Sequence, residues 1–216
     1  MRKLVLVVVV LLCLSSSLFV QAKNDLVMVN NVKYASKVYL DFSDANELSL
    51  FDIQNDGGGT MISNGVLYAD AQMYFKLPLK APLIYVVSMK LPYGKDDDIG
   101  PALKGVGANT WVAVSVKNYA YTGDNCLSLR VLSQPRKSRS VDFSSTPNEY
   151  LNFYPLVMKY SGSEVCATAV DETRCISYGV FDYVYVGFDT TWDIETKDTT
   201  LYDYMIVFSP QYTMVL

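Results

Sequence analysis

Two aromatic residues stand directly before carboxylates near the end of this 216-residue chain, at Trp192-Asp193 and at Tyr202-Asp203. Aromatic rings stack on the apolar faces of sugars, and carboxylates catalyse glycoside hydrolysis or bind metal ions. The pairing therefore raises the hypothesis of a sugar-binding surface that carries a catalytic or metal-ligating acid. The alternative is that both pairs belong to the end of a β-sandwich and have no chemical role.

Acids with the spacing of a hydrolase pair occur at Asp96 and Asp98, and again at Asp193 and Glu195. Residues two positions apart on a strand share a face at about 7 Å, within the range of about 5–9.5 Å that glycoside hydrolysis uses. We interpret both segments as solvated turns, however. The sequence therefore assigns no catalytic residue, and an enzyme is the less favoured hypothesis.

Calcium is a better metal candidate than zinc, because the chain has no histidine and hard cations take oxygen ligands. Asp203, on the predicted closing strand, could coordinate an ion near the opening strand, where Asp41 lies. Capping or pairing at a strand end is the alternative for Asp203. We expect no required cofactor, with calcium as the one candidate ion. The absence of histidine also excludes Ser-His-Asp and Cys-His catalysis.

The segment Trp111–Tyr121 alternates between valines and larger aromatic or polar residues. Val112, Val114 and Val116 share one parity, which predicts that they face the core. The residues of opposite parity face solvent, and rings from later segments could extend this face. The predicted ligand-binding residues are Trp111, Lys117, Tyr119, Tyr121, Tyr183, Tyr185 and Trp192. Stacking on these rings would bind a glycan. A protein contact and a plain tyrosine-rich β-surface are the alternatives.

The N-terminus has the features of a secretory signal peptide. Arg2 and Lys3 precede an apolar run from Leu4 to Leu14, and a small-residue site ends at Ala22. We expect a signal peptide at residues 1–22 that is cleaved, because the apolar run is shorter than the roughly 20 residues of a membrane span. An uncleaved anchor helix is the alternative. The mature protein is predicted to be secreted or held at the cell surface.

Removal of residues 1–22 leaves 16 basic and 22 acidic residues, a net charge of −6. This charge disfavours nucleic acid and anionic membranes as partners, and we expect no membrane insertion after cleavage. The predicted partner is carbohydrate or an extracellular protein surface. Self-association into a homo-oligomer is a further alternative.

Three cysteines remain after residue 22. Cys166 and Cys175 flank a short segment with a turn near Asp171, and in an exported protein this arrangement predicts a disulfide. Two buried thiols are the alternative. Cys126 is left over, either as a half-buried residue or as a partner for another molecule.

Segments rich in Val, Ile, Tyr, Phe and Thr recur between clusters of Gly, Asn, Asp and Pro, which is typical of an all-β sandwich or barrel. The predicted strands are Lys37–Phe42, Gly65–Ala69, Met73–Leu77, Leu83–Lys90, Trp111–Tyr119, Cys126–Leu132, Tyr150–Tyr160, Glu164–Val170, Arg174–Gly179, Tyr183–Phe188 and Asp203–Phe208. Leu83–Met89 is apolar on both faces, which indicates a central strand. One sandwich domain is expected at 38–210, after a lead-in or extra edge strand at 23–37 and before a tail at 211–216.

Four short motifs occur in a familiar order: Asn64-Gly65-Val66-Leu67, Lys159-Tyr160-Ser161-Gly162, Val186-Gly187 and Tyr202-Asp203-Tyr204. Together they resemble the concanavalin A-like lectin/glucanase superfamily. Within that superfamily, the order of the motifs is similar to that of a laminin-G-like jelly roll. The resemblance implies a jelly roll of two antiparallel sheets, one curved, with ligands often bound on the concave face or at a rim. It implies no particular activity. Glucanase members carry an E-x-D-x-E pattern on one strand, and the sequence lacks this pattern.

Three functional hypotheses follow. The first is an exported, non-enzymatic module that recognises glycan or another extracellular surface through exposed aromatics. The second is a structural subunit of an extracellular filament or surface layer, in which Leu26-Val27-Met28-Val29 adds as a strand to a neighbour. The third is a carbohydrate-active enzyme, a glucanase or a lyase.

Overall fold

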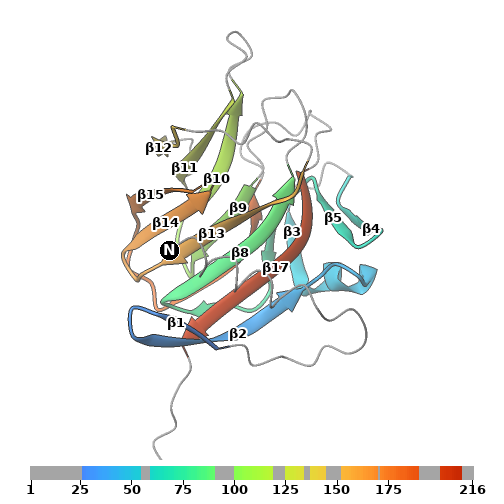
Figure 1. Cartoon of the computed structure of the whole chain (residues 1–216), viewed down its shortest axis with the longest axis horizontal. Helices are drawn as coiled ribbons and strands as arrows, with labels where there is room; N and C mark the ends of the chain where they lie inside the picture. The colour runs from blue at the N-terminus through green and yellow to red at the C-terminus, as the bar shows by residue number, and fades with distance from the viewer. Residues whose placement is uncertain are drawn as a thin grey trace, which may run out of the picture.

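The computed structural model describes residues 26–54, 59–90, 100–118, 125–133, 137–144, 152–169, 171–189 and 200–210. These residues form an all-β sandwich of two antiparallel sheets (Figure 1). The predicted signal peptide at 1–22 and the predicted tail at 211–216 lie outside this description. In the described ranges, no helix is long and apolar enough to cross a membrane.

Sheet A has nine strands. Its main path runs β1 (Leu26–Val29), β2 (Val32–Leu40), β17 (Thr200–Pro210), β8 (Leu83–Lys90), β13 (Tyr154–Tyr160), β14 (Glu164–Ala169) and β15 (Glu172–Ser177). Off this path, β5 (Val66–Ala69) pairs with β17, and β4 (Met61–Ser63) pairs with β5. The segment that is apolar on both faces, Leu83–Met89, therefore lies in the central strand β8, as predicted.

Sheet B has eight strands. Its path runs β12 (Lys137–Asp142), β11 (Asn125–Ser133), β10 (Thr110–Asn118), β9 (Gly100–Gly105), β16 (Tyr183–Asp189), β6 (Gln72–Phe75) and β3 (Phe51–Gln54), with β7 (Leu79–Lys80) beside β16. A short 3₁₀ helix, η1 (Ala45–Leu50), precedes β3, and Asp44 caps its N-terminus. This topology confirms the two-sheet jelly roll that the sequence predicts.

The main core lies between the sheets, and tyrosines bridge it. Val112 and Val114 are buried in this core, as their parity predicts. The buried Tyr85 hydroxyl of sheet A donates a hydrogen bond to the Gly187 carbonyl of sheet B at 2.9 Å. Tyr178, just after β15, donates to the Thr110 carbonyl at 2.6 Å and accepts from the Gly105 amide at 3.0 Å. Part of the tyrosine content therefore serves the interior rather than a wet surface.

Strand β9 lies at the centre of sheet B, although the sequence predicts no strand between Lys90 and Trp111. Gly and Pro at its start lower β-propensity, which explains why sequence patterning misses it. The structure requires a glycine there, because a Cβ atom at Gly100 would lie 1.5 Å from the Val114 carbonyl oxygen. Glycine thus allows β9 to approach β10 closely.

The N-terminal segment forms a β-hairpin at the edge of sheet A, with β1 as the outermost strand. Its two turn residues, Asn30 and Asn31, have φ angles of 49° and 64°. Two successive positive φ angles, which asparagine tolerates, are typical of a two-residue hairpin turn. The opening strand β2 therefore starts at Val32, earlier than the predicted Lys37.

The predicted disulfide is confirmed. Cys166 on β14 and Cys175 on β15 are direct cross-strand partners, with Cα atoms 4.0 Å apart and their sulfurs bonded. The hairpin turn between them places Asp171 at a φ of 64°. The bond therefore staples the β14–β15 hairpin at one edge of sheet A.

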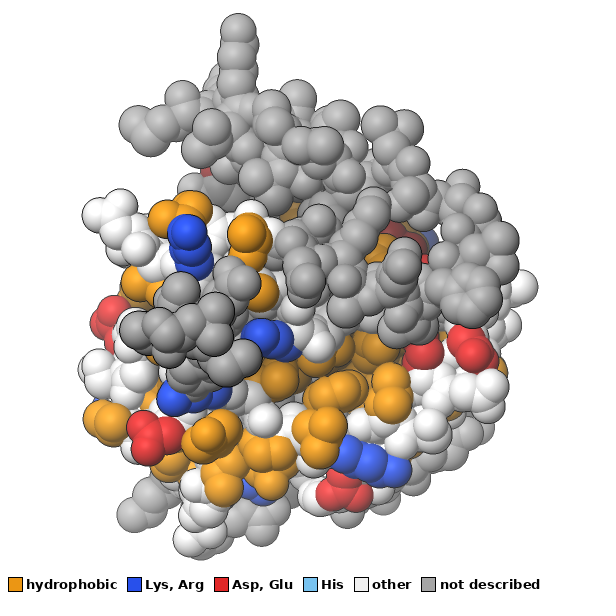
Figure 2. All heavy atoms as spheres, turned by 90° about the horizontal axis from the view of Figure 1, so that it is seen from below, with side chains coloured by type: hydrophobic (Ala, Val, Ile, Leu, Met, Phe, Trp, Pro, Cys, Tyr) orange, Lys and Arg blue, Asp and Glu red, His pale blue; other side chains and the backbone are white. Residues whose placement is uncertain are grey.

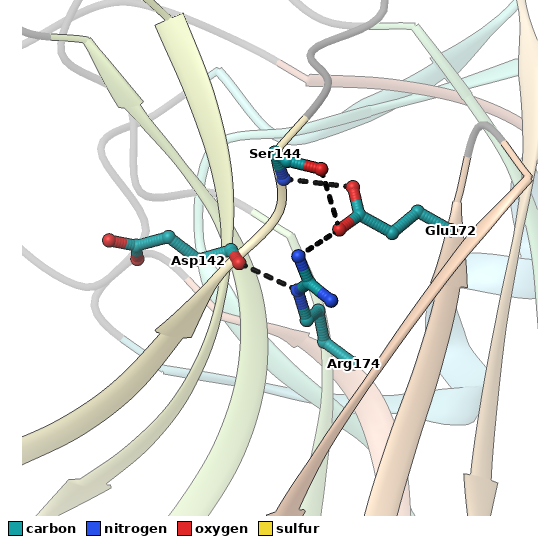
Figure 3. Close-up of polar contacts among 4 residues, drawn as sticks. All are labelled: Asp142, Ser144, Glu172 and Arg174. Carbon is teal, nitrogen blue, oxygen red and sulfur yellow. Dashed lines mark hydrogen bonds and ion pairs between the residues drawn. The ribbon is translucent and has the colours of Figure 1, made fainter.

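A polar network connects this edge to the β12 edge of sheet B (Figure 3). Glu172 on β15 accepts hydrogen bonds from the Ser144 amide and hydroxyl at 2.8 and 2.9 Å, and it forms an ion pair with Arg174. Arg174 also donates to the Asp142 carbonyl at 2.8 Å. These contacts hold β12 against β15, so that the two sheets are joined along this side.

Candidate functional site

The candidate site is the outer face of sheet B, the face directed away from the core. The strand pairings align one row of residues across it: Asp52, Tyr74, Gly187, Ala102, Ala113, Arg130 and Ser140, on β3, β6, β16, β9, β10, β11 and β12. The three central residues are small, whereas Tyr74 and Arg130 flank them. The row therefore forms a low floor between two larger side chains.

Aromatic rings gather around this floor. Tyr74, Ala102, Ala113 and Leu132 form a buried apolar cluster, against which Trp111 and Tyr185 pack while half-buried. A neighbouring row places Lys104 of β9 between Tyr185 of β16 and Trp111 of β10. The Lys104 ammonium lies 5.8 Å from the centre of the Tyr74 ring. The cation therefore lies over one ring, and the two strand neighbours of Lys104 also carry rings.

Among the described residues, the buried polar atoms of this face without a hydrogen-bond partner include the Tyr74 hydroxyl, the Trp111 indole nitrogen and the Ser115 hydroxyl. Buried polar groups in proteins are almost always hydrogen-bonded, because an unpaired group loses its contacts with water. A ligand with several hydroxyl groups would satisfy these three atoms. Glycans have this chemistry, and their apolar faces match the adjacent rings.

Asp189 ends β16 on the same face and is 1% exposed. Burial, and then the charge of Asp189, raise the pKa of the Tyr74 phenol well above its usual 10.0. Gln72 acts in the opposite direction, although no hydrogen bond of good geometry joins it to the Tyr74 hydroxyl. Tyr74 therefore remains protonated near neutral pH and can donate a hydrogen bond.

In the described part of sheet B, the outer face carries three carboxylates, each on a different strand: Asp52, Asp142 and Asp189. Asp52 is two strands from β16 and two residues out of line with Asp189, so their Cα atoms are about 12 Å apart, and Asp142 is four strands away, about 19 Å. The second distance is too large for a pair acting on one glycosidic bond. Asp189 and Asp52 are therefore the pair closest to a catalytic arrangement among the described residues.

The structure places some of the predicted ligand-binding residues together. Trp111, Tyr183 and Tyr185 all lie on the outer face of sheet B, with Tyr183 47% exposed. Lys117 is on β10 opposite Cys126, but its side chain is not among those described. Tyr119, Tyr121 and Trp192 lie outside the described residues, as do Asp96, Asp98, Asp193 and Glu195.

The prediction that this face is wet is wrong at its centre. Ser115 and Ser128, which strand parity assigns to the solvent side, are both 0% exposed. Ser128 donates to the Asp142 carboxylate at 2.7 Å, whereas the Ser115 hydroxyl has no partner. The alternation of residues along the strand correctly predicts which side chains face away from the core. It does not predict their exposure to solvent, because exposure depends on the elements that pack over that face.

Sequence reasoning missed Tyr74, Lys104 and Asp189. Asp189 has the parity of Tyr185 and follows the predicted strand end by one residue, so extending that strand would have found it. Lys104 could not be found without strand β9. Tyr74 joins the site only through the pairing of β6 with β16, which local sequence does not encode.

The predicted metal ligands Asp41 and Asp203 are close enough to interact. Burial, and then the charge of Asp41, raise the pKa of Asp203. Glu47 on η1 belongs to the same region, since burial first and Asp41 second raise its pKa to about 7. Among the described residues, the group of three potential ligands whose atoms all lie within 4.8 Å of one another is Glu164, Cys166 and Cys175, not these acids, so calcium binding at Asp41 and Asp203 stays a prediction.

The same fold occurs in several solved glycan-cleaving enzymes. Endo-β-1,3-glucanase from Pyrococcus furiosus matches with a TM-score of 0.60 and 11% identity, covering 87% of this chain and 99% of that one. β-Agarase B from Zobellia galactanivorans matches at 0.66 and 9%, covering 86% and 96%. The catalytic domain of an endo-1,3-β-glucanase (laminarinase) from Thermotoga petrophila RKU-1 matches at 0.61 and 14%, covering 84% and 100%. These matches confirm the concanavalin A-like jelly roll.

No protein-family model matches the sequence, and no curated protein matches it either. The similar solved structures are glucanases and agarases. They contradict the first hypothesis, that of a non-enzymatic binding module. They favour the alternative of a carbohydrate-active enzyme. The sequence still lacks the E-x-D-x-E pattern.

Proposed function

We propose that the protein is a carbohydrate-active enzyme that binds a polysaccharide across the outer face of sheet B and cleaves it. The fold supports this proposal, since the similar solved structures named above are endo-glucanases and an agarase. The predicted signal peptide supports export, which would bring the enzyme to an extracellular polysaccharide. Fold alone does not fix activity, so the proposal depends on the site.

The unpartnered polar atoms of Tyr74, Trp111 and Ser115 are the observation that carries the proposal. Tyr74 and Trp111 belong to the aromatic cluster around Ala102 and Ala113, and Ser115 is two residues from Ala113 on β10. A Cβ atom at Gly187 would lie 2.0 Å from the Met73 carbonyl oxygen, so glycine is needed there for β6 to pair closely.

Asp189 and Asp52 are the proposed catalytic carboxylates. Hydrolysis with inversion places an acid and a base about 6.5–9.5 Å apart, so that a water molecule fits between the base and the sugar. The Cα separation of about 12 Å across two strands is closer to this arrangement than to the shorter one of retaining enzymes. Gln54 donates to Asp52 at 3.0 Å and holds its carboxylate. Tyr74, between the two acids, would donate a hydrogen bond to the substrate.

Incubation of the protein with β-1,3-glucan and agarose, followed by measurement of new reducing ends, tests the proposal. We expect Asp189→Asn and Asp52→Asn each to lower the rate at least ~100-fold, the usual effect of losing a general acid or base. Asp171→Asn, on the exposed turn between β14 and β15, is the matched control and should retain full activity. Full activity of both site variants would reject the catalytic assignment.

The stereochemistry of the first product gives an independent check. NMR of the fresh reducing end should show an inverted anomeric configuration if Asp189 and Asp52 act as proposed. A retained configuration would reject this pair. Absence of any cleavage product from a broad panel of polysaccharides would reject the enzyme itself.

A further inference from the structure

Lys104 occupies the middle of the proposed substrate surface. It lies on β9, the central strand of the sheet B path, and points to the outer face because its neighbour Leu103 is in the core. Tyr185 and Trp111 are its direct partners on the adjacent strands. A sugar stacked on either ring would bring its substituents next to the Lys104 ammonium.

Among the described residues, Lys104 forms no ion pair, and its one recorded contact is with the face of the Tyr74 ring at 5.8 Å. The lysine is half-buried. The outer-face acids lie in other rows. The Asp189 backbone is four residues along β16 from Tyr185, about 13 Å away, and the charge of Asp189 acts on Tyr74 without an ion pair to Lys104. A partly desolvated cation is unfavourable without a counter-charge, and a cation–π contact offsets only part of this penalty.

We infer that the polysaccharide is anionic and that Lys104 binds a carboxylate or sulfate group on it. This inference rests on the proposed function, because it assigns a substrate class to the same surface. The contact is a charge-assisted hydrogen bond, which is stronger than a neutral one and weakens with salt. The flanking rings of Tyr185 and Trp111 would hold the sugar that carries the anionic group. The net negative charge of the chain repels polyanions in general, so such binding would require a local cation.

Affinity for polysaccharides is the test, with alginate for carboxylates, carrageenan for sulfates, and laminarin as the neutral reference. We expect the wild-type protein to bind at least one anionic polymer more tightly than laminarin, with an advantage that shrinks as salt increases. Lys104→Gln should reduce this advantage about tenfold. Lys104→Arg keeps the charge and should restore most of it, which shows that the loss does not arise from misfolding.

Lys159→Gln is the matched control. Lys159 is also half-buried and central in its sheet, but it lies on the outer face of sheet A. Its replacement should leave the preference for anionic polymers in place. Equal affinity for laminarin and both polyanions, or the same preference in Lys104→Gln as in wild type, would overturn the inference. Cleavage of neutral polysaccharides alone would overturn it while leaving the proposed enzyme intact, whereas binding without any cleavage would reject only the enzyme.

Discussion

Tyrosine hydroxyls have two different roles in this protein, and hydrogen bonding separates them. Tyr85 and Tyr178 use their hydroxyls to connect one sheet to the other. Tyr74 is equally buried but has no partner, and it faces outward. A hydroxyl that is satisfied internally contributes to stability, whereas an unsatisfied one is available to a ligand. This distinction identifies Tyr74, rather than the tyrosines as a class, as a site residue.

Replacement of Tyr85 by Phe should lower the free energy of unfolding by about 1–2 kcal/mol, because the buried Gly187 carbonyl loses its donor. Burial raises the pKa of Tyr85 well above its usual value, so the loss should be the same across neutral pH. Urea unfolding measures it. Tyr183→Phe, at a ring that is 47% exposed, is the control and should have little effect. Equal stability of the two variants would contradict the bridging role.

Glu47 gives the fold a pH dependence. Its pKa rises from 4.5 to about 7, with burial as the first cause and Asp41 as the second. The folded state therefore holds a proton that the unfolded state loses, and stability should fall as pH rises from about 4.5 through 7. Glu47→Gln should flatten this slope in thermal melts.

Calcium would raise the melting temperature at alkaline pH if Asp41 and Asp203 bind it, and Asp203→Asn should remove that increase.

At the scale of elements, β9 shows how one strand depends on backbone contact. Gly100→Ala should be severely destabilising, by more than about 3 kcal/mol, since its Cβ would lie 1.5 Å from a backbone oxygen that cannot move freely. Gly65→Ala is the comparison, because Gly65 has open space and only a positive φ of 72°. There we expect a loss of about 1 kcal/mol. Similar losses in chemical denaturation would mean that β9 and β10 can separate without penalty.

At the scale of the whole molecule, the edge strand β1 leaves one side of sheet A open to pairing with another chain. It has no charged residue, proline or bulge, which are the devices that protect edges from pairing. Leu26 and Met28 are 54% and 58% exposed, and hydrophobic side chains form a band on the side that contains β1 and β2 (Figure 2). An apolar, unprotected edge favours pairing with another chain.

We therefore expect the protein without residues 1–22 to self-associate as its concentration rises. Sedimentation velocity measures this association. The double variant Leu26→Lys/Met28→Lys should shift it toward monomer, while Leu77→Lys, at another residue that is 67% exposed, is the control. Monomers at every concentration would reject the filament or surface-layer hypothesis as well as the homo-oligomer.

Sequence patterning recovered most long strands because their alternation is local. Leu83–Lys90 was predicted with the bounds that β8 has, and the Cys166–Cys175 pair followed from two predicted strands with a turn between them. Short strands such as β3, β4, β7 and β12 were missed. Each has two to six residues. Length alone does not explain the misses, because β5 and β6 have four residues each and were predicted; the missed strands are defined by their pairing with neighbours.

By itself, the sequence determined the all-β class, the core-facing parity of Val112 and Val114, and the disulfide, because adjacent residues set strand periodicity and hairpin geometry. Only the tertiary structure decided which strands meet. Lys104, Tyr74 and Asp189 come from three separate strands and share a face through long-range pairing between β9, β16 and β6. Burial of Ser115 and the orphaned hydroxyl of Tyr74 are likewise properties of assembled sheets. No local pattern encodes them, since exposure depends on what the rest of the chain packs against.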